Sequence, residues 1–148
     1  MEKMFGIFTK PEHVEKIVNY LNTSTNIDYI ISTNKYEIYS YNFDIGVSYC
    51  FPWIVDIDYP TKGERRWFNY HPSPLPEYPG LTNYADAIRG KVKSFGVTLH
   101  RMTHVVDGGE VVKQLDFPLR SVPTNTSELG SICHYYLFQL FKETIEEL

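Results

Sequence analysis

The sequence predicts an α/β fold, with a mainly parallel twisted sheet and flanking helices. Short apolar segments of strand length alternate with amphipathic segments of helical period along the chain, and its 148 residues suffice for one core of ordinary size. We therefore expect residues 1–148 to form a single domain. In such a fold, ligands gather at the carboxyl ends of the parallel strands.

The chain is predicted to open with a strand that leads into a helix. Residues 5–8 form a short apolar run, followed by Thr9, which is expected to cap the helix, and Pro11, which suits its first turn. Polar residues 22–26 are expected to end the helix. Apolar side chains recur between these limits at i, i+3, i+4 and i+7, in a stripe formed by Val14, Ile17, Val18 and Leu21.

Three further strands are predicted before the middle of the chain. Residues 29–32 and 45–51 are apolar, and the second of these segments stops at Pro52, which has no N–H for a strand ladder. Residues 67–70 form a short aromatic strand. Residues 72–80 then contain four prolines and a glycine, which interrupt regular structure.

The next elements are a short helix and two strands. Residues 83–89 have the composition of a helix that ends at a glycine. Residues 95–101 alternate apolar and polar side chains with the period of two that a strand requires, and a glycine pair leads into a further strand at residues 111–117.

A long amphipathic helix is predicted at the end of the chain. Residues 129–145 repeat apolar side chains at helical spacing, after a cap at Thr126 or Ser127. An apolar helix of this length is able to pair with a second subunit, so a homodimer is one expectation.

Charge and composition argue against several classes of partner. Fourteen Lys and Arg against eighteen Asp and Glu give a net charge of −4 without a basic run, so nucleic acid is not expected to bind. The sequence shows neither a signal-peptide pattern nor an apolar stretch of about 18 residues, so no membrane association is expected. Cys50 and Cys133 lie outside any Cys-x-x-Cys motif, which favours a reducing, cytoplasmic compartment.

The most informative segment is residues 69–76, in which an amide and an imidazole precede a loop stiffened by prolines. With the period of a strand, Asn69 and His71 project to the same side, where both can reach one reacting atom. An isolated Asn-x-His is common at strand ends without a chemical role. Here it is followed by Gly-x-Thr-x-His at residues 96–100 and by Asp-x-Gly at residues 107–109.

These ordered motifs resemble the folate-dependent formyltransferases, a family that includes glycinamide ribonucleotide, methionyl-tRNA and sugar-amine formyltransferases. The family carries Asn-x-His-Pro-Ser-x-Leu-Pro, a downstream glycine, Gly-x-Thr-x-His and a later Asp-x-Gly. The resemblance is best over residues 44–112 and implies the family's Rossmann-like formyltransferase domain. It also implies transfer of a formyl group from 10-formyltetrahydrofolate to a primary amine of a small acceptor, such as an amino sugar or a compound like glycinamide ribonucleotide.

Three residues of this chain match the family's catalytic trio: Asn69, His71 and Asp107. When an amine attacks the formyl carbon an oxyanion forms, which the Asn69 amide and a protonated His71 would stabilise. Asp107 would hold His71 cationic through its charge and would assist proton transfer to the leaving nitrogen. The resemblance implies no metal ion.

The resemblance further implies a folate site built from two loops, with apolar side chains over the pterin and backbone groups at its edge. From the residues alone, Phe51, Trp53 and Met102 are just as typical of ordinary core. The folate-binding residues implied are Phe51, Pro52, Trp53, Ile54, Met102, Thr103, His104, Val105 and Val106.

One segment departs from the glycinamide ribonucleotide branch. Those enzymes hold the substrate phosphate with a Gly- and Ser-rich loop after the first strand, whereas this chain has Thr9, Lys10 and Pro11 there. Proline removes a donor, and without glycine the phosphate cannot approach the backbone closely, so the purine-pathway substrate is in doubt. The transfer-RNA branch, with its additional basic domain, fits less well. We expect a minimal catalytic domain that acts on a small amine.

Two other functions stay open. Water in place of the amine would make the protein a 10-formyltetrahydrofolate hydrolase, or deformylase, and a third possibility is a folate-binding protein without catalysis. Arg65 or Arg66, from a charged cluster that also contains Lys62 and Glu64, would meet an anionic substrate if the cluster faces the site.

Several other motifs carry weaker chemical signals. His100 and His104 have a spacing that suits a metal ion only on a helix, whereas His100 falls in a predicted strand. Asp56 and Asp58 are typical of a solvated acidic loop. Ser73 has no nucleophile-elbow motif around it and is expected to shape its loop.

Overall fold

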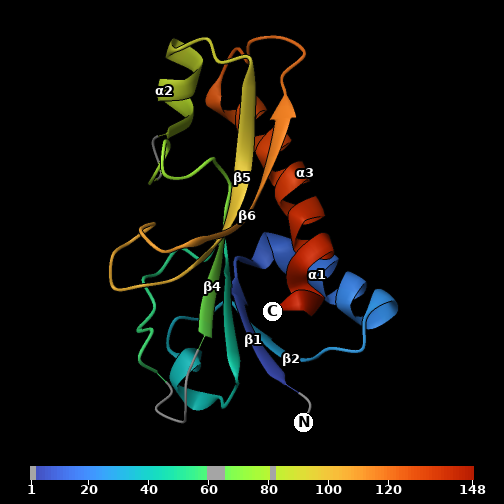
Figure 1. The fold of residues 1–148 in the computed structure, drawn as a ribbon. Coiled ribbons are helices and arrows are strands. Elements are labelled where there is room, and N and C mark those ends of the chain that lie inside the picture. Colours follow the sequence, from blue (N-terminus) through green and yellow to red (C-terminus); the bar gives the residue numbers. More distant parts are fainter. Residues whose placement is uncertain (1–2, 60–65, 81–82) are drawn as a thin grey trace.

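A six-stranded sheet forms the centre of the protein, in a computed structural model that describes residues 3–59, 66–80 and 83–148. The strand order is β2-β1-β3-β4-β5-β6 (Figure 1). The strands are β1 (Met4–Thr9), β2 (Asp28–Ser32), β3 (Ile45–Tyr49), β4 (Arg66–His71), β5 (Ser94–Arg101) and β6 (Val111–Pro118). The helices are α1 (Pro11–Ser24), α2 (Asn83–Arg89) and α3 (Thr126–Thr144), with the 3₁₀ helices η1 (Glu37–Ser40) and η2 (Ile145–Glu147).

The sheet is mainly parallel, which confirms the predicted α/β class. β1 pairs in parallel with β2 and β3, and β3 pairs in parallel with β4. β5 runs antiparallel to β4, and β6 runs antiparallel to β5, so β5 alone among these strands points against the others. The sequence analysis did not anticipate this reversal.

The two faces of the sheet bury different clusters because side chains alternate along each strand. Figure 1 shows α1 and α3 on the same side of the sheet. Phe5 and Ile7 of β1 pack toward this side, with Ile17 and Leu21 of the predicted helical stripe. Phe8, the next residue of β1, belongs to a second cluster, which includes Ile38, Phe43, Phe51, Val55 and Trp67.

The start of α1 differs from the prediction. Thr9 does not cap the helix, because it ends β1 and its hydroxyl donates to the Tyr49 carbonyl at 2.6 Å. Lys10 takes the N-cap position without a side-chain hydrogen bond to the helix, and Pro11 occupies the first turn as predicted. The hydroxyl of Thr9 therefore ties β1 to the end of β3.

The C-terminal helix and the end of β3 also depart from their predicted limits. The side chain of Asn125, before the predicted caps, accepts a hydrogen bond from the Glu128 N–H at 2.8 Å and begins α3. β3 ends at Tyr49 because Cys50 turns the chain with a φ of 54°, in the left-handed region that non-glycine residues seldom adopt. In the part of the chain that the structure describes, no helix combines the length and apolarity needed to cross a membrane.

Candidate active site

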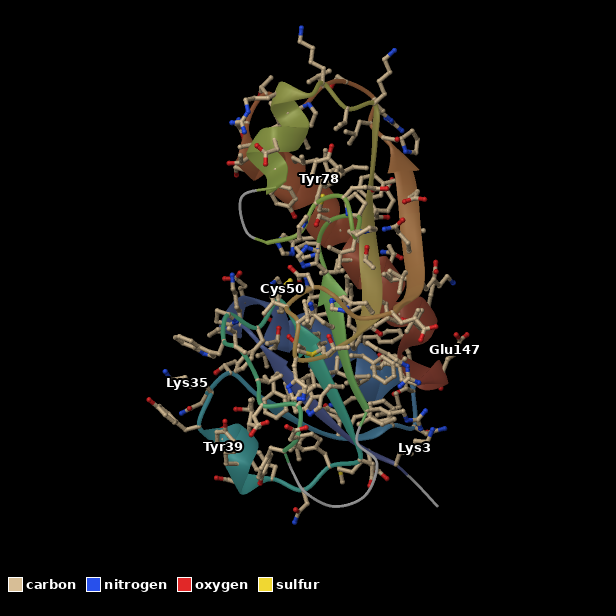
Figure 2. The ribbon with its side chains drawn as sticks, turned by 60° about the vertical axis from the view of Figure 1, so that its left-hand side comes forward. Lys3, Lys35, Tyr39, Cys50, Tyr78 and Glu147 are labelled. Carbon is tan, nitrogen blue, oxygen red and sulfur yellow. The ribbon has the colours of Figure 1, made fainter. Side chains whose placement is uncertain are left out.

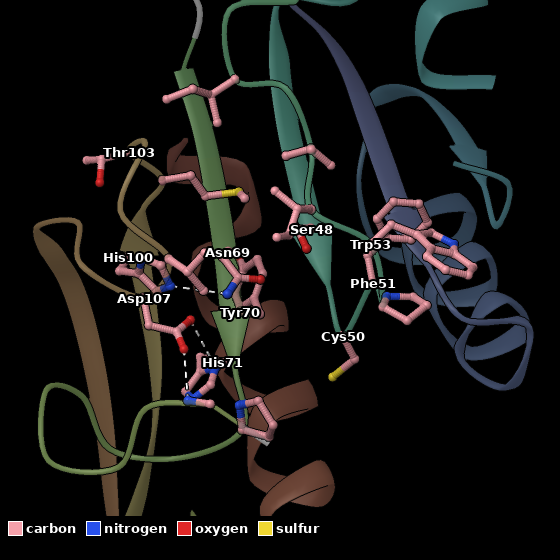
Figure 3. Close-up of a pocket in the computed structure, with 18 of the residues that line it drawn as sticks. Ser48, Cys50, Phe51, Trp53, Asn69, Tyr70, His71, His100, Thr103 and Asp107 are labelled. Carbon is pink, nitrogen blue, oxygen red and sulfur yellow. Dashed lines mark hydrogen bonds and ion pairs between the residues drawn. The ribbon is translucent and has the colours of Figure 1, made fainter. Parts of the chain in front are cut away.

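A cavity of about 570 Å³ brings together the residues that the sequence analysis singled out (Figure 3). Its wall is made by β4, by the loop after β3 and by the loop between β5 and β6. All twelve predicted site residues line it: Asn69, His71, Asp107, Phe51, Pro52, Trp53, Ile54, Met102, Thr103, His104, Val105 and Val106.

The register of the sheet positions Asn69. It lies opposite Ser48 of β3 and opposite His100 of β5. Its Nδ2 is 3.1 Å from His100 Nε2, while His100 Nδ1 is 2.8 Å from the Arg101 carbonyl oxygen. Since a carbonyl only accepts, His100 carries its proton on Nδ1, and its Nε2 accepts from the Asn69 amide. One of the two amide hydrogens of Asn69 is thereby fixed, and the other stays available to a ligand.

His100 lines the cavity and contacts Asn69, a position the sequence analysis missed because it weighed this side chain only as a metal ligand. The side chain is buried and holds Asn69. The signal was present in the Gly-x-Thr-x-His motif, whose last residue faces Asn69 across an antiparallel pair.

The threonine of the same motif fixes the proline loop. The buried Thr98 hydroxyl donates to the Ser73 carbonyl at 2.9 Å and accepts from the Leu75 N–H at 3.1 Å. Gln114 Nε2 lies 2.9 Å from the same hydroxyl oxygen. The Ser73 hydroxyl donates to the Tyr78 carbonyl at 2.5 Å, which confirms that Ser73 shapes the loop.

His71 and Asp107 meet at the carboxyl end of β4. His71 Nδ1 is 3.6 Å from Asp107 Oδ1, and their side chains are 9% and 10% exposed. The second carboxylate oxygen, Oδ2, accepts from the Gly80 N–H at 2.9 Å. His71 Nε2 lies 3.3 Å from the Tyr78 carbonyl oxygen. Asp107 has a φ of 56°, and such left-handed conformations in non-glycine residues are enriched at functional sites.

Two opposing influences act on the charge of His71. Asp107 was expected to keep the imidazole cationic. Burial instead lowers the pKa of His71, and this effect exceeds the opposing influence of the Asp107 charge and of the Tyr78 carbonyl. Burial thus favours the neutral imidazole, which can accept a proton, while both ring nitrogens face oxygen atoms that would stabilise the imidazolium.

The loop between β5 and β6 carries Asp107 to His71. It begins beside the first half of β4, where the Met102 N–H donates to the Trp67 carbonyl at 2.8 Å, and it reaches the end of β4 at Asp107. The two ends of the loop close tightly, since a Cβ on Gly109 would lie 1.6 Å from the Arg101 carbonyl oxygen. Only glycine fits that position without moving the backbone.

The two predicted folate loops present apolar side chains to solvent. Trp53 is 45% exposed and Ile54 86% exposed, and Val105 and Val106 are also exposed. Phe51 is different, because it is buried against Phe8 with ring centroids 5.8 Å apart. Phe51 therefore serves the core as well as the cavity wall, whereas Trp53 has the exposure that a ligand-covering side chain needs.

Over the residues that the structure describes, the weaker motifs form no second site. Asp56 and Asp58 are both exposed, and Asp56 also lines the cavity. The Asp58 N–H donates to the Asp56 carboxylate at 3.0 Å in a local turn. The Nε2 atom of His104 lies 3.6 Å from Oδ1 of Asp58. Among the described residues, His104 does not form a metal-ligating group with His100. Arg66 is exposed at the start of β4. Lys62, Glu64 and Arg65 lie outside the described residues.

The buried histidines predict a fall in stability at acid pH. Burial, with the charge of Lys16, lowers the pKa of His13 from 6.5 to about 4, and burial also lowers the pKa of His71 and His134. Below pH 6.5 the unfolded chain gains protons that the folded protein takes up only at lower pH. We expect the free energy of unfolding to fall between pH 7 and pH 4, by at most about 3 kcal/mol from His13, at about 1.4 kcal/mol per pKa unit.

Urea unfolding of the metal-free protein across this pH range measures the effect. His13→Asn is the matched control, because it removes the titrating group while keeping a polar side chain. It should flatten the dependence of the free energy of unfolding on pH. An equally steep dependence in this variant would show that other groups cause the acid instability.

Known proteins similar to this chain agree with the motifs. Residues 32–130 match the family described as formyl transferase. The chain is 33% identical over 84 residues to phosphoribosylglycinamide formyltransferase of Escherichia coli, a match that covers 57% of this chain and 40% of that protein. It is also 33% identical over 99 residues to the bifunctional polymyxin resistance protein ArnA of Wigglesworthia glossinidia brevipalpis, covering 67% of this chain and 15% of that protein. These matches span less than half the length of either relative.

Solved structures share the fold. Phosphoribosylglycinamide formyltransferase of Streptococcus pneumoniae aligns with a TM-score of 0.74 at 20% identity, over 98% of both chains. The N-formyltransferase of Helicobacter canadensis, solved with folinic acid and dTDP-3-aminofucose, aligns with a TM-score of 0.72 at 22% identity, over 99% of this chain and 63% of that one. The Rossmann-like fold with its flanking helices is thus the one seen in these enzymes, and the family match over two thirds of the sequence shows that the chain belongs to the formyl transferase family.

Proposed function

We propose that the protein transfers a formyl group from 10-formyltetrahydrofolate to a primary amine of a small acceptor, either an amino sugar or a compound like glycinamide ribonucleotide. The observation that carries the proposal is the meeting of Asn69, His71 and Asp107 in one cavity, from segments far apart in the chain. The same cavity is bounded by two loops with exposed apolar side chains, which suit the flat ring system of a folate.

The chemistry follows from the positions of these groups. The acceptor nitrogen attacks the formyl carbon, and the carbonyl oxygen becomes an oxyanion. The amide hydrogen of Asn69 that His100 does not engage is available to this oxygen. Because His100 already holds the amide in place, little reorganisation is needed as the charge develops.

Proton transfer is assigned to His71 and Asp107. Neutral His71 accepts the proton that the attacking amine loses, directly or through water, and Asp107 stabilises the imidazolium that results. The proton then passes to the folate nitrogen as its bond to the formyl carbon breaks. The products are the formylated amine and tetrahydrofolate, so atoms and charge balance without a redox step.

Folate binding is the first expected result. The metal-free protein should bind a stable 10-formyltetrahydrofolate analogue, because the proposed folate loops contain no set of metal-ligating side chains. Calorimetry with and without a chelator should give the same affinity. No binding at high folate concentration, or binding only after zinc is added, would contradict the proposal.

The acceptor is identified by mass spectrometry of the products from a panel of amines, with the released folate measured in parallel. Formate release that needs no amine would instead identify a hydrolase. We further propose that the protein acts in the cytoplasm, where its two free cysteines would stay reduced.

Glycinamide ribonucleotide is expected to be a poor acceptor. α1 starts at Pro11, which lacks an N–H, and its N-cap is Lys10. Without glycines at this helix start, a phosphate cannot approach the backbone N–H groups closely. The measurement is the kcat/KM for this compound against the amino-sugar nucleotides of the panel. If it is used as efficiently as the best of them, Lys10 or another cation supplies the phosphate site.

A further inference from the structure

Three metal-ligating side chains gather beside the cavity, outside the proposed catalytic trio. They are His13 of α1, Cys50 directly after β3 and His134 of α3, and their ligand atoms all lie within 4.8 Å of one another. Within the described parts of the chain this is the one such group of histidine, cysteine and acidic side chains. We propose that His13, Cys50 and His134 bind a divalent zinc-class metal ion.

The ligand atoms lie somewhat farther apart than they would around such an ion. Zinc bonds of about 2.0–2.1 Å to nitrogen and about 2.3 Å to sulfur place tetrahedral N and S ligands roughly 3.5 Å apart. Cys50 Sγ lies 3.9 Å from His134 Nδ1, and the His13 and His134 rings stack with centroids 5.3 Å apart. Movements of a few tenths of an ångström to about one ångström would close the site.

The backbone at Cys50 directs the thiol to the histidines. Cys50 lies where the chain leaves β3 (Figure 2), and its left-handed φ of 54° turns the chain there. Figure 3 shows its sulfur pointing away from Phe51 and Trp53, the residues that continue into the predicted folate loop. A strained conformation at this one residue thus separates the cluster from that loop.

His13 gives independent support. The side chain is buried, with 5% of the residue exposed, and its Nε2 has no hydrogen-bond partner. The nearest carboxylate oxygen, from Glu12, is 3.6 Å away. Buried nitrogen atoms almost always have a partner, and a metal ion bound by the cluster would compensate for burying this polar ring.

The protonation states of the two histidines suit metal binding, whereas that of Cys50 opposes it. Burial and the nearby lysines lower the pKa of both His13 and His134, so both rings are neutral near pH 7, as a ligand must be. Burial raises the pKa of the Cys50 thiol to about 12, so the ion has to displace that proton, which leaves to solvent. The charges of Lys10 and Lys16 repel a positive ion but favour the Cys50 thiolate. The charge of Glu12 attracts the ion but disfavours the thiolate.

The site has room for one more ligand. Cys50 and His134 both line the cavity, so a fourth coordination position on that side is open to water or to an oxygen atom of a bound molecule. Three protein ligands and one open position are typical of zinc sites that bind substrates. Metal binding is measured on the ligand-free protein and does not depend on the proposed formyl transfer.

Cobalt and zinc titrations of the full chain test the proposal. One Co²⁺ per chain should give the intense absorption of a thiolate-to-cobalt transition, and one equivalent of Zn²⁺ should remove it. Cys50→Ser should abolish this absorption, and His134→Asn or His13→Asn should weaken Zn²⁺ binding by at least about 10-fold, since even groups that only orient metal ligands have effects of that size. His104→Asn is the matched control, because this histidine is exposed and outside the cluster, and its Zn²⁺ affinity should match that of the parent.

Circular dichroism establishes that each variant is folded. If a variant does not fold, the parent protein alone decides: Zn²⁺ should protect the Cys50 thiol from alkylation. The proposal is wrong if the parent shows no thiolate-to-cobalt absorption, or if folded Cys50→Ser binds Zn²⁺ as tightly as the parent.

Discussion

His71→Ala is expected to lower the kcat of formyl transfer by about 100- to 10,000-fold, the range that general acid–base catalysis contributes. The imidazole is the proposed proton acceptor and is buried, with one nitrogen toward Asp107 and the other toward the Tyr78 carbonyl. Alanine removes the acceptor without adding bulk. The folate affinity should change by no more than a few-fold, because His71 belongs to neither of the two proposed folate loops.

Asp107→Asn tests the same step with less disturbance. Asparagine tolerates the left-handed φ of 56° at this position, and its side-chain oxygen can still accept from the Gly80 N–H. Only the negative charge is lost, so an imidazolium at His71 forms less readily. We expect kcat to fall by about 100-fold or more, within the same general range.

Glu110→Gln is the matched control for this charge, because Glu110 is exposed at the end of the same loop and does not line the cavity. Its kcat should stay within about two-fold of the parent. Single-turnover rates, folate affinity and thermal unfolding should be recorded together. Folded His71→Ala and Asp107→Asn proteins that bind folate and keep kcat within a few-fold of the parent would show that the assignment is wrong.

Local sequence pattern was sufficient for part of this site. The period of two along β4 placed Asn69 and His71 on one face, and the structure has both in the cavity wall. The resemblance to the formyltransferases also implied Asp107 beside them, and the structure has it 3.6 Å from His71. The first feature follows from the geometry of a strand and the second from a known family motif, so both were predictable.

Other features depend on packing that no single segment encodes. The reversal of β5 decides which residues face β4, and through it His100 comes to hold Asn69. The lowered pKa of His71 depends on the depth of its burial, which no pattern in the sequence gives. The residues His13, Cys50 and His134 come from two helices and the end of a strand. Because they are far apart in the sequence, their spacing along the chain does not predict the cluster.

Asn69→Ala is expected to lower kcat by about 100- to 1,000-fold, or roughly 3 to 4 kcal/mol, as the loss of one oxyanion donor does in other acyl-transfer enzymes. The side chain lies between Ser48 and His100, on the face of β4 that borders the cavity. Alanine keeps the backbone pairing of the strand. Binding of folate in the ground state should be nearly unchanged, because the donor acts on charge that appears only during the reaction.

The His100 contact turns this expectation into a sharper test. His100 acts through Asn69, so it is a positioning residue, and His100→Ala alone should reduce kcat less than Asn69→Ala does. Because the two side chains form one hydrogen-bonded unit, the double variant should be no slower than Asn69→Ala. If the two residues acted independently, the fold-reductions in kcat of the two single variants would multiply in the double variant. Rates of the four proteins, each checked by thermal unfolding, measure this coupling. If the two effects multiply in folded proteins, His100 does not act by orienting the Asn69 amide, and the oxyanion donor must be held in another way.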